Sequence, residues 1–185
     1  MRYELFSVPF FIGNIDLKKI KLESDIGYPF EISKTPSSFG RKNTVDPESG
    51  DYLVETIIEL LKEKYNNFII TINEIWRNKY LDNDYQEPHT HINTSFSFII
   101  YEEIPTGAYT IFFNPAKYLI QATVGYDENI IPLKFKPDVN KGQIIIFPSY
   151  VEHMVNRNSD QVTISGNFDF QSKFGPGRLL SPHQN

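Results

Sequence analysis

Short runs of β-branched and aromatic residues dominate the chain from residue 68 onward. Turn residues separate these runs, which is the pattern of successive strands. Many short strands in succession after one helix predict a mainly β fold of the antiparallel sandwich or barrel type. The predicted strands cover residues 68–76, 94–101, 109–113, 118–124, 133–135, 143–147 and 161–170.

One segment has the spacing of an amphipathic helix. From Asp51 to Tyr65, apolar residues recur every three or four positions and charged residues fall mainly on the other side. Either Asp46-Pro47 or Asp51 could begin the helix, because aspartate caps helices and proline fits the first turn. We expect this helix to pack on the sheet and to carry no site of its own.

The first fifty residues predict looser structure. Residues 3–15 have the composition of a strand broken at Pro9 and Gly13. Residues 24–50 are rich in Ser, Pro, Gly, Lys and Asn. We expect that segment to form a surface loop, with a flap over a substrate as the alternative.

The length and composition indicate one globular domain. A chain of 185 residues with 40% hydrophobic and 15% aromatic residues is large enough for a core. We expect a single domain over residues 1–185, with its core at 68–170 and an irregular tail at 171–185. The net charge of −5 makes nucleic acid a less favoured partner, because nucleic-acid binding usually requires a basic surface.

The absence of cysteine excludes disulfides, thiolate metal sites and a cysteine nucleophile. It also agrees with a reducing compartment. The N-terminal residues do not fit a secretory signal, and no apolar run has the length of a membrane span. We therefore expect a soluble, cytoplasmic protein without a membrane partner.

Three of the four histidines have the spacing of a metal site. His89 and His91 flank Thr90, and His153 follows the apolar run of residues 142–148. Residues i and i+2 of a strand point to the same face, so the first two could bind one ion together. Imidazole binds iron, zinc, copper and nickel, so the metal stays open at this point. We expect the fourth, His183, to be solvated in the tail.

Two blocks of sequence around these histidines resemble the 2-oxoglutarate and iron(II)-dependent oxygenases, and most closely a small His-x-His subgroup that phages often encode. The first block contains Trp76-Arg77-Asn78, Tyr85-Gln86-Glu87-Pro88-His89-Thr90-His91 and Ser95 to Tyr101. The second contains Lys141 to Ser149, His153-Met154-Val155 and Ser165-Gly166-Asn167. The resemblance implies a double-stranded β-helix, that is, a jelly roll or cupin-like fold, braced here by the one main helix.

The resemblance also implies an activity. His89, His91 and His153 would be the catalytic iron(II) ligands, and 2-oxoglutarate would be the co-substrate for hydroxylation of an unknown substrate. That substrate is a small molecule or a protein side chain. A homodimer is left open, and a phage-encoded protein would work in the host cytoplasm.

Two positions depart from the common oxygenase pattern. His91 stands where most members carry Asp or Glu, which leaves an iron site of three neutral imidazoles. Gln161 and Thr163 stand where an Arg-x-Ser pattern usually binds the remote carboxylate of the co-substrate. The other candidate co-substrate contacts are Tyr85, Asn78, Ser97 and Arg157, with Arg77 and Lys117 as alternative partners of the carboxylate, and with Glu87 and Glu152 as candidate extra carboxylates at the metal.

Two other functions stay open on the sequence. A three-histidine iron site can serve a dioxygenase that does not use 2-oxoglutarate, and Gln161 favours that reading. The third hypothesis is an inactive jelly roll that serves as a virion or interaction protein.

Overall fold

The computed structural model describes residues 7–26, 28–29, 35–106, 110–123, 125, 127–129, 131–158 and 160–173. Its helices are η1 (Leu17–Lys19), α1 (Pro47–Leu61) and α2 (Lys117–Gln121). Its strands are β1 (Phe11–Asn14), β2 (Leu22–Ser24), β3 (Tyr28–Pro29), β4 (Pro36–Ser37), β5 (Asn43–Val45), β6 (Phe68–Lys79), β7 (Asp84–His89), β8 (Phe96–Glu103), β9 (Thr110–Phe113), β10 (Lys134–Phe135), β11 (Gln143–Pro148), β12 (His153–Asn158) and β13 (Val162–Ser172).

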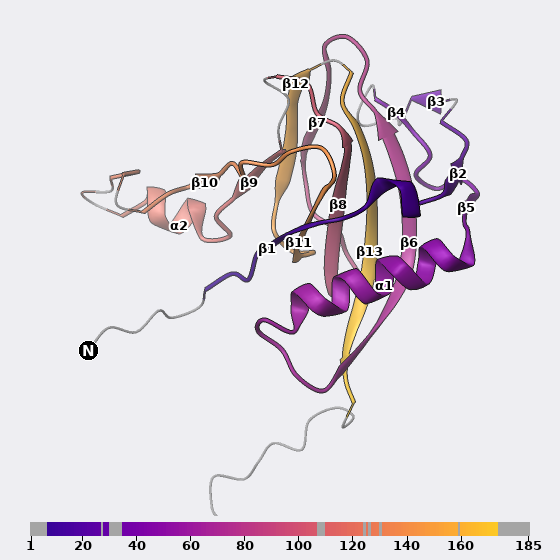
Figure 1. The fold of residues 1–185 in the computed structure, drawn as a ribbon. Helices are drawn as coiled ribbons and strands as arrows, with labels where there is room; N and C mark the ends of the chain where they lie inside the picture. Colours follow the sequence, from indigo (N-terminus) through magenta and orange to yellow (C-terminus); the bar gives the residue numbers. More distant parts are fainter. Residues whose placement is uncertain are drawn as a thin grey trace, which may run out of the picture.

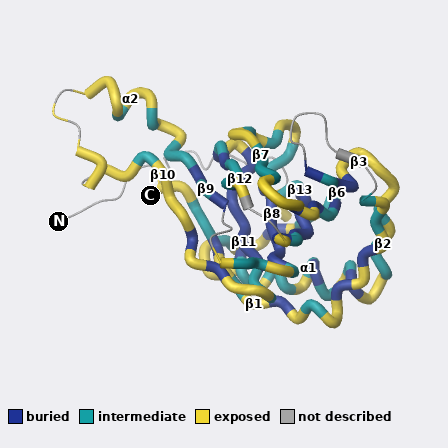
Figure 2. Tube along the Cα trace, turned by 90° about the horizontal axis from the view of Figure 1, so that it is seen from above, coloured by how far each residue is buried: buried dark blue, intermediate teal, exposed yellow. Residues whose placement is uncertain are grey.

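The strands form two facing sheets and a separate two-stranded sheet of β2 and β5. The larger sheet has the order β1-β11-β8-β13-β6-β4-β3, and the smaller has the order β10-β9-β12-β7. Figure 1 shows α1 lying across the larger sheet, while α2 and β10 project away from it. Seen from above, α1, the larger sheet and the smaller sheet follow one another as layers (Figure 2). The expected mainly β jelly roll, braced by one main helix, is confirmed.

Alternate residues of the central strands fill two separate cores. Phe98 and Ile100 of β8 belong to the core between the larger sheet and α1, whereas Ile99 and Tyr101 belong to the core between the two sheets. This is the two-residue period of a strand that is buried on both faces. The space between the sheets is therefore bounded by regular strands, and the site described below lies in it.

Helix α1 begins at the earlier of its two predicted starts. The Asp46 side chain accepts a hydrogen bond from the Ser49 N–H at 3.3 Å and caps the helix. Leu53, Ile57 and Leu61 form its buried stripe. Each such side chain contributes about 1.5–3 kcal/mol on burial, so the helix is held mainly by this stripe.

Strand β1 runs through Gly13 instead of breaking there. A Cβ atom at Gly13 would lie 2.5 Å from Cδ2 of Leu60 on α1. The glycine therefore lets the helix pack closely on the strand, and the predicted break is wrong.

The strand predicted over residues 118–124 is also wrong. Residues 117–121 form α2, and Val124 lies outside the described residues. Tyr118 and Leu119 are 72% and 78% exposed. Because no sheet in the described part of the chain covers these side chains, their strand propensity does not decide the local structure.

Regular structure also appears where loops were expected. Residues 81–86 have the composition of a turn, yet residues 84–89 form β7, which is the edge strand of the smaller sheet. An edge strand tolerates polar residues and a proline such as Pro88. Strand β7 therefore lacks the alternation of apolar residues by which strands are recognised in a sequence. The segment 24–50 contains β3, β4 and β5, with residues 27 and 30–34 outside the described part of the chain.

The described structure ends close to the predicted boundary between the core and the C-terminal tail. Strand β13 extends to Ser172, two residues into the predicted tail. Residues 1–6 and 174–185, including His183, lie outside the described residues, and the domain limits stay predictions. Among the described residues, no helix has the length and apolar character needed to span a membrane.

Candidate active site

Two of the three predicted metal ligands face each other across a strand pair. His89 is the last residue of β7, His153 is the first residue of β12, and they are register partners. Side chains of register partners project to the same face of a sheet. The pairing therefore brings together two histidines that are far apart in sequence.

His91 reaches the same place from a loop. It lies two residues beyond the end of β7, so the expectation that both histidines of the triplet lie on one strand is wrong. The His91 N–H donates to the Ser149 carbonyl oxygen at 3.0 Å, and its ring stacks on Trp76 with 5.7 Å between centroids. These contacts hold His91 in position without a strand.

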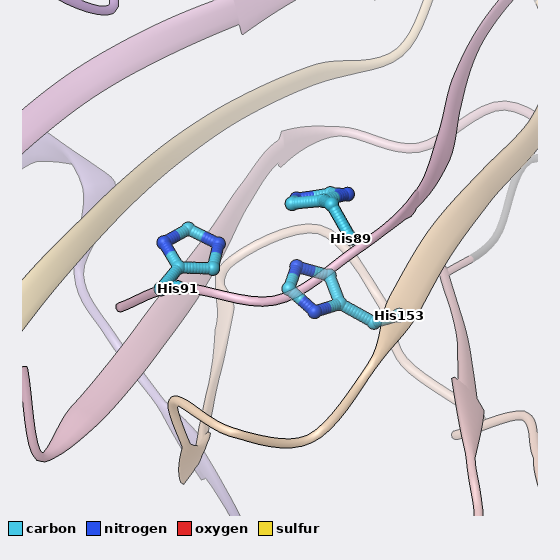
Figure 3. A group of neighbouring side chains, drawn as sticks. All are labelled: His89, His91 and His153. Atoms are coloured by element: carbon cyan, nitrogen blue, oxygen red, sulfur yellow. The ribbon is translucent and has the colours of Figure 1, made fainter. Parts of the chain in front are cut away.

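The three imidazoles converge on one point. The ring centroids of His89 and His153 are 4.2 Å apart, and those of His91 and His153 are 5.2 Å apart. One nitrogen of each ring lies within 4.8 Å of the others, and Figure 3 shows the rings gathered around a common space. Three nitrogens this close together could hold one metal ion.

Hydrogen bonds fix which nitrogen each strand histidine presents. Nδ1–H of His89 donates to the Glu87 carbonyl oxygen at 2.7 Å, and Nδ1–H of His153 donates to the Val151 carbonyl oxygen at 3.1 Å. A proton held on Nδ1 leaves Nε2 with its lone pair for a metal. Both rings are therefore oriented as ligands.

Burial keeps the cluster neutral. Desolvation lowers the pKa of His89, His91 and His153, and neighbouring imidazoles lower those of His91 and His153 further. The pKa of His91 falls to about 4. Since a metal binds unprotonated imidazole, no proton competes with it at neutral pH.

The candidate extra carboxylates do not join this group. Among the described residues, the metal-binding cluster consists of the three histidines alone. Glu152 pairs with Lys117, and the side chain of Glu87 is exposed. The iron site implied by the resemblance thus has three neutral ligands.

An inner cavity lies behind the histidines, between the two sheets. Three of the predicted co-substrate contacts, Asn78, Ser97 and Thr163, line it, together with Tyr80 and Thr110. Its volume is about 20 Å³, which is room for about one water molecule. Binding of a larger acid therefore requires the surrounding side chains to move apart.

Hydrogen bonds tie the polar wall of this cavity together. The Ser97 hydroxyl donates to Oδ1 of Asn167 at 2.9 Å and lies 2.8 Å from the Ser149 hydroxyl. Nδ2 of Asn78 donates to the Ser165 hydroxyl at 3.4 Å. These bonds fix the wall next to the histidines.

Gln161, a predicted co-substrate contact, directly precedes β13 and lines neither the inner cavity nor the outer one. Its side chain is 0% exposed, and neither its amide oxygen nor its amide nitrogen has a hydrogen-bond partner among the described residues. It lies two positions before Thr163 and so shares that residue's face of the sheet. A buried, unpaired amide costs free energy that a bound polar ligand would recover.

The basic candidates lie away from the histidines. The Arg77 guanidinium binds the Glu102 carboxylate through two nitrogens, at 2.6 and 2.9 Å, and the Arg157 guanidinium lies 4.9 Å from the ring centroid of Tyr85. Neither arginine lines a cavity with the histidines, and neither do Tyr85 and Lys117. Among the described residues, no lysine or arginine lines either cavity.

A larger outer cavity opens from His89 and His91 toward the surface. Its volume is about 280 Å³, and its lining includes Glu74, Phe39 and Ile92. The sequence did not single out these three residues. For Glu74 a signal existed, because it alternates with Trp76 and Asn78 along β6 and must share their face.

Comparisons with known proteins identify the family of the chain. The family described as "Putative 2OG-Fe(II) oxygenase" matches residues 74–169, more than half of the chain. The match includes all three histidines and Gln161. No curated protein sequence matches the chain.

The fold is similar to those of several solved structures. A Pseudomonas putida prolyl-4-hydroxylase aligns with a TM-score of 0.52 and 13% identity, over 82% of this chain and 78% of that one. EvdMO1 aligns with a TM-score of 0.52 and 13% identity, over 80% of this chain and 39% of that one. An oxidoreductase of the 2OG-Fe(II) oxygenase family from Burkholderia pseudomallei has a TM-score of 0.49 and 10% identity, over 86% of this chain and 67% of that one.

Proposed function

The chain belongs to the 2OG-Fe(II) oxygenase family, and on that premise we propose which of its residues carry the reaction. His89, His91 and His153 bind the iron(II) ion. The converging imidazoles carry this proposal, because neutral, oriented nitrogen donors suit iron. With the co-substrate and oxygen, the bound iron supplies the oxidation: one oxygen atom enters a substrate C–H bond and the other enters succinate, with loss of carbon dioxide.

Gln161 and Thr163 bind the remote carboxylate of 2-oxoglutarate. The unpaired Gln161 amide offers two N–H donors, and the Thr163 hydroxyl offers a third on the same sheet face. Asn78 and Ser97 line the inner cavity together with Thr163 and the histidines. They orient the rest of the acid.

Charge balance supports a neutral anchor for this carboxylate. Three neutral imidazoles leave both positive charges of iron(II) uncompensated, and the dianion of 2-oxoglutarate cancels them. A nearby arginine would leave the loaded site with a net positive charge in a low-dielectric interior, which is costly. The histidine at position 91 and the glutamine at position 161 therefore suit the same dianion.

Apolar side chains next to the proposed iron ligands exclude water from the site. Phe147, Val155 and Ile99 line the inner cavity, and Phe147 packs against His153 with 4.8 Å between ring centroids. Excluding water in this way strengthens the electrostatic contacts inside the site and limits side reactions.

The direct test is conversion of 2-oxoglutarate to succinate by the purified protein with iron(II) and oxygen. Even without the true substrate, slow uncoupled turnover is expected, and His153→Ala should abolish it. Oxidation of a substrate without 2-oxoglutarate would support the three-histidine dioxygenase instead. Absence of both iron and 2-oxoglutarate binding would support the inactive jelly roll.

A further inference from the structure

The outer cavity has a negative lining. Among the described residues, its charged side chains are Glu74 and Glu87, and no lysine or arginine lines it. The cavity adjoins His89 and His91, so a molecule bound there lies next to the proposed iron site. The charge of the cavity lining therefore influences which substrates can bind next to the iron.

Among the described residues, no salt bridge joins either carboxylate to a cation, and the basic residue that shares a cavity with one of them is Arg41, which lines a neighbouring cavity with Glu74. The salt bridges in this part of the chain join other pairs, such as Arg77 with Glu102 and Lys141 with Glu103. Glu74 is half-buried and accepts a hydrogen bond from Nδ2 of Asn167 at 3.2 Å. That neutral contact leaves its charge in place.

Apolar groups form the rest of the wall. Trp76 and Phe39 meet edge to face with 5.0 Å between centroids, and Ile92 is 80% exposed. These side chains can cover an aliphatic stem of a few carbon atoms. A volume of about 280 Å³ is close to the lower limit of ordinary ligand pockets, roughly 300 Å³.

The loaded iron site does not offset this negative charge. Iron(II) and the dianion of 2-oxoglutarate cancel, and the three imidazoles are neutral. Glu74 and Glu87 then determine the sign of the field that a substrate meets in the outer cavity. Such a field favours cations and disfavours anions.

We propose that the substrate of this oxygenase carries a protonated nitrogen, an ammonium or guanidinium group, on an apolar stem. Glu74 and Glu87 bind the cation, and the stem packs against Trp76 and Phe39. This inference rests on the proposed function and adds the substrate class. A free amine and a basic side chain of a protein share this chemistry, and the test separates them.

The test is equilibrium binding read by tryptophan fluorescence, since Trp76 is the only tryptophan of the chain and lines the cavity. Pentylamine, pentanol and pentanoate share one stem and differ in charge. With anaerobic iron(II) and 2-oxoglutarate present, pentylamine should bind roughly tenfold more tightly than pentanol, and pentanoate should bind least. Equal binding of the amine and the alcohol, or no amine binding where 2-oxoglutarate binds, would overturn the proposal.

Peptides identify the source of the cation. A short lysine peptide that binds more tightly than pentylamine, and loses this affinity when the lysine is Nε-acetylated, indicates a protein side chain. The reverse order indicates a small amine. Both outcomes support the proposal, whereas tighter binding of the acetylated peptide contradicts it.

Charge variants test the two carboxylates separately. Glu87→Gln should weaken pentylamine binding about three- to tenfold and leave pentanol binding unchanged, and Glu87→Lys should reverse the preference between amine and acid. Glu74→Gln should weaken amine binding as well, but it also alters the contact with Asn167. The exposed Glu87 is thus the cleaner test, and Glu55→Gln on the exposed side of α1 is the matched control.

The same titration separates this inference from the proposed function. Metal-free protein keeps neutral imidazoles and both carboxylates, so it should also prefer the amine. The protein could fail to bind iron and still prefer the amine, and lose that preference in the Glu87 variants. This result would support the cation site and contradict the proposed iron ligands. If the protein binds iron and 2-oxoglutarate but does not prefer the amine over the alcohol, the proposed function is supported and the cation site is contradicted.

Discussion

His89 and His153 are register partners at the end of the β7–β12 pair, and their ring centroids are 4.2 Å apart. The fold therefore positions two of the three metal ligands through main-chain hydrogen bonding before any metal binds. His91 is held differently, by a loop contact to Ser149 and by stacking on Trp76. Metal affinity should reflect this difference.

Replacing a strand ligand should cost more affinity than replacing the loop ligand. We expect His89→Ala and His153→Ala to weaken iron(II) binding at least about a hundredfold, because even partners of metal ligands contribute roughly 10–100-fold. His91→Ala should weaken it less, since the two opposed strand ligands remain. Anaerobic metal titration measures this, with His183→Ala as the control that should bind normally.

The histidine cluster should make the metal-free protein sensitive to acid. Burial lowers the pKa of these imidazoles below 6.5 in the folded state, to about 4 for His91. Between those values the unfolded chain binds more protons than the folded one, so the free energy of unfolding falls as pH decreases from 6.5 toward 4. Above pH 6.5 this contribution is constant.

Urea unfolding at several pH values measures the acid sensitivity. His91→Gln should flatten the dependence between pH 6.5 and 4, because one depressed imidazole is lost. An unchanged slope in this variant would contradict the assignment of the low pKa to His91.

Gln161 should cost stability and contribute ligand affinity. Gln161→Leu keeps the size of the side chain and removes the unpaired amide, so the free protein should gain about 1 kcal/mol or stay equally stable. The same change should weaken 2-oxoglutarate binding roughly tenfold, since an N–H donor pair is lost. Chemical denaturation and calorimetry give the two values.

The opposite pattern would argue against the proposed anchor. If Gln161→Leu is less stable and binds 2-oxoglutarate normally, the amide has a structural partner and no role in the co-substrate site. Thr163→Val offers a second test at the same sheet face.

Gly166 should be intolerant of a side chain. A Cβ atom there would lie 2.7 Å from the Glu74 carbonyl oxygen and would also meet the Phe98 ring. We expect Gly166→Ala to destabilise the protein by about 1–3 kcal/mol through overpacking. Gly50→Ala in α1 is the control, because its Cβ would meet only Val45 at 3.9 Å, and it should stabilise the helix by about 0.5–1 kcal/mol.

The sequence predicted the parts of this protein that depend on local patterns. The amphipathic stripe of α1 and most strands of the larger sheet are visible because buried faces repeat with a fixed period. His89, His91 and His153 were found by their spacing within two motif blocks. The jelly roll and the oxygenase family followed from the same blocks and are confirmed.

Features that depend on tertiary contacts were missed. The polar edge strand β7 resembles a turn in sequence, and the apolar residues of α2 resemble a strand although no sheet covers them. The position of Arg77, turned toward Glu102, could not be known without the register of β6. Homodimer formation, phage origin and a cytoplasmic location stay predictions.

Calorimetric titration of the metal-free protein, first with iron(II) and then with 2-oxoglutarate, tests the central claim most directly. We predict one iron per chain, 2-oxoglutarate binding that requires the iron, and loss of both in His153→Ala. Iron binding that persists in His153→Ala, or 2-oxoglutarate binding that is independent of the metal, would contradict the account.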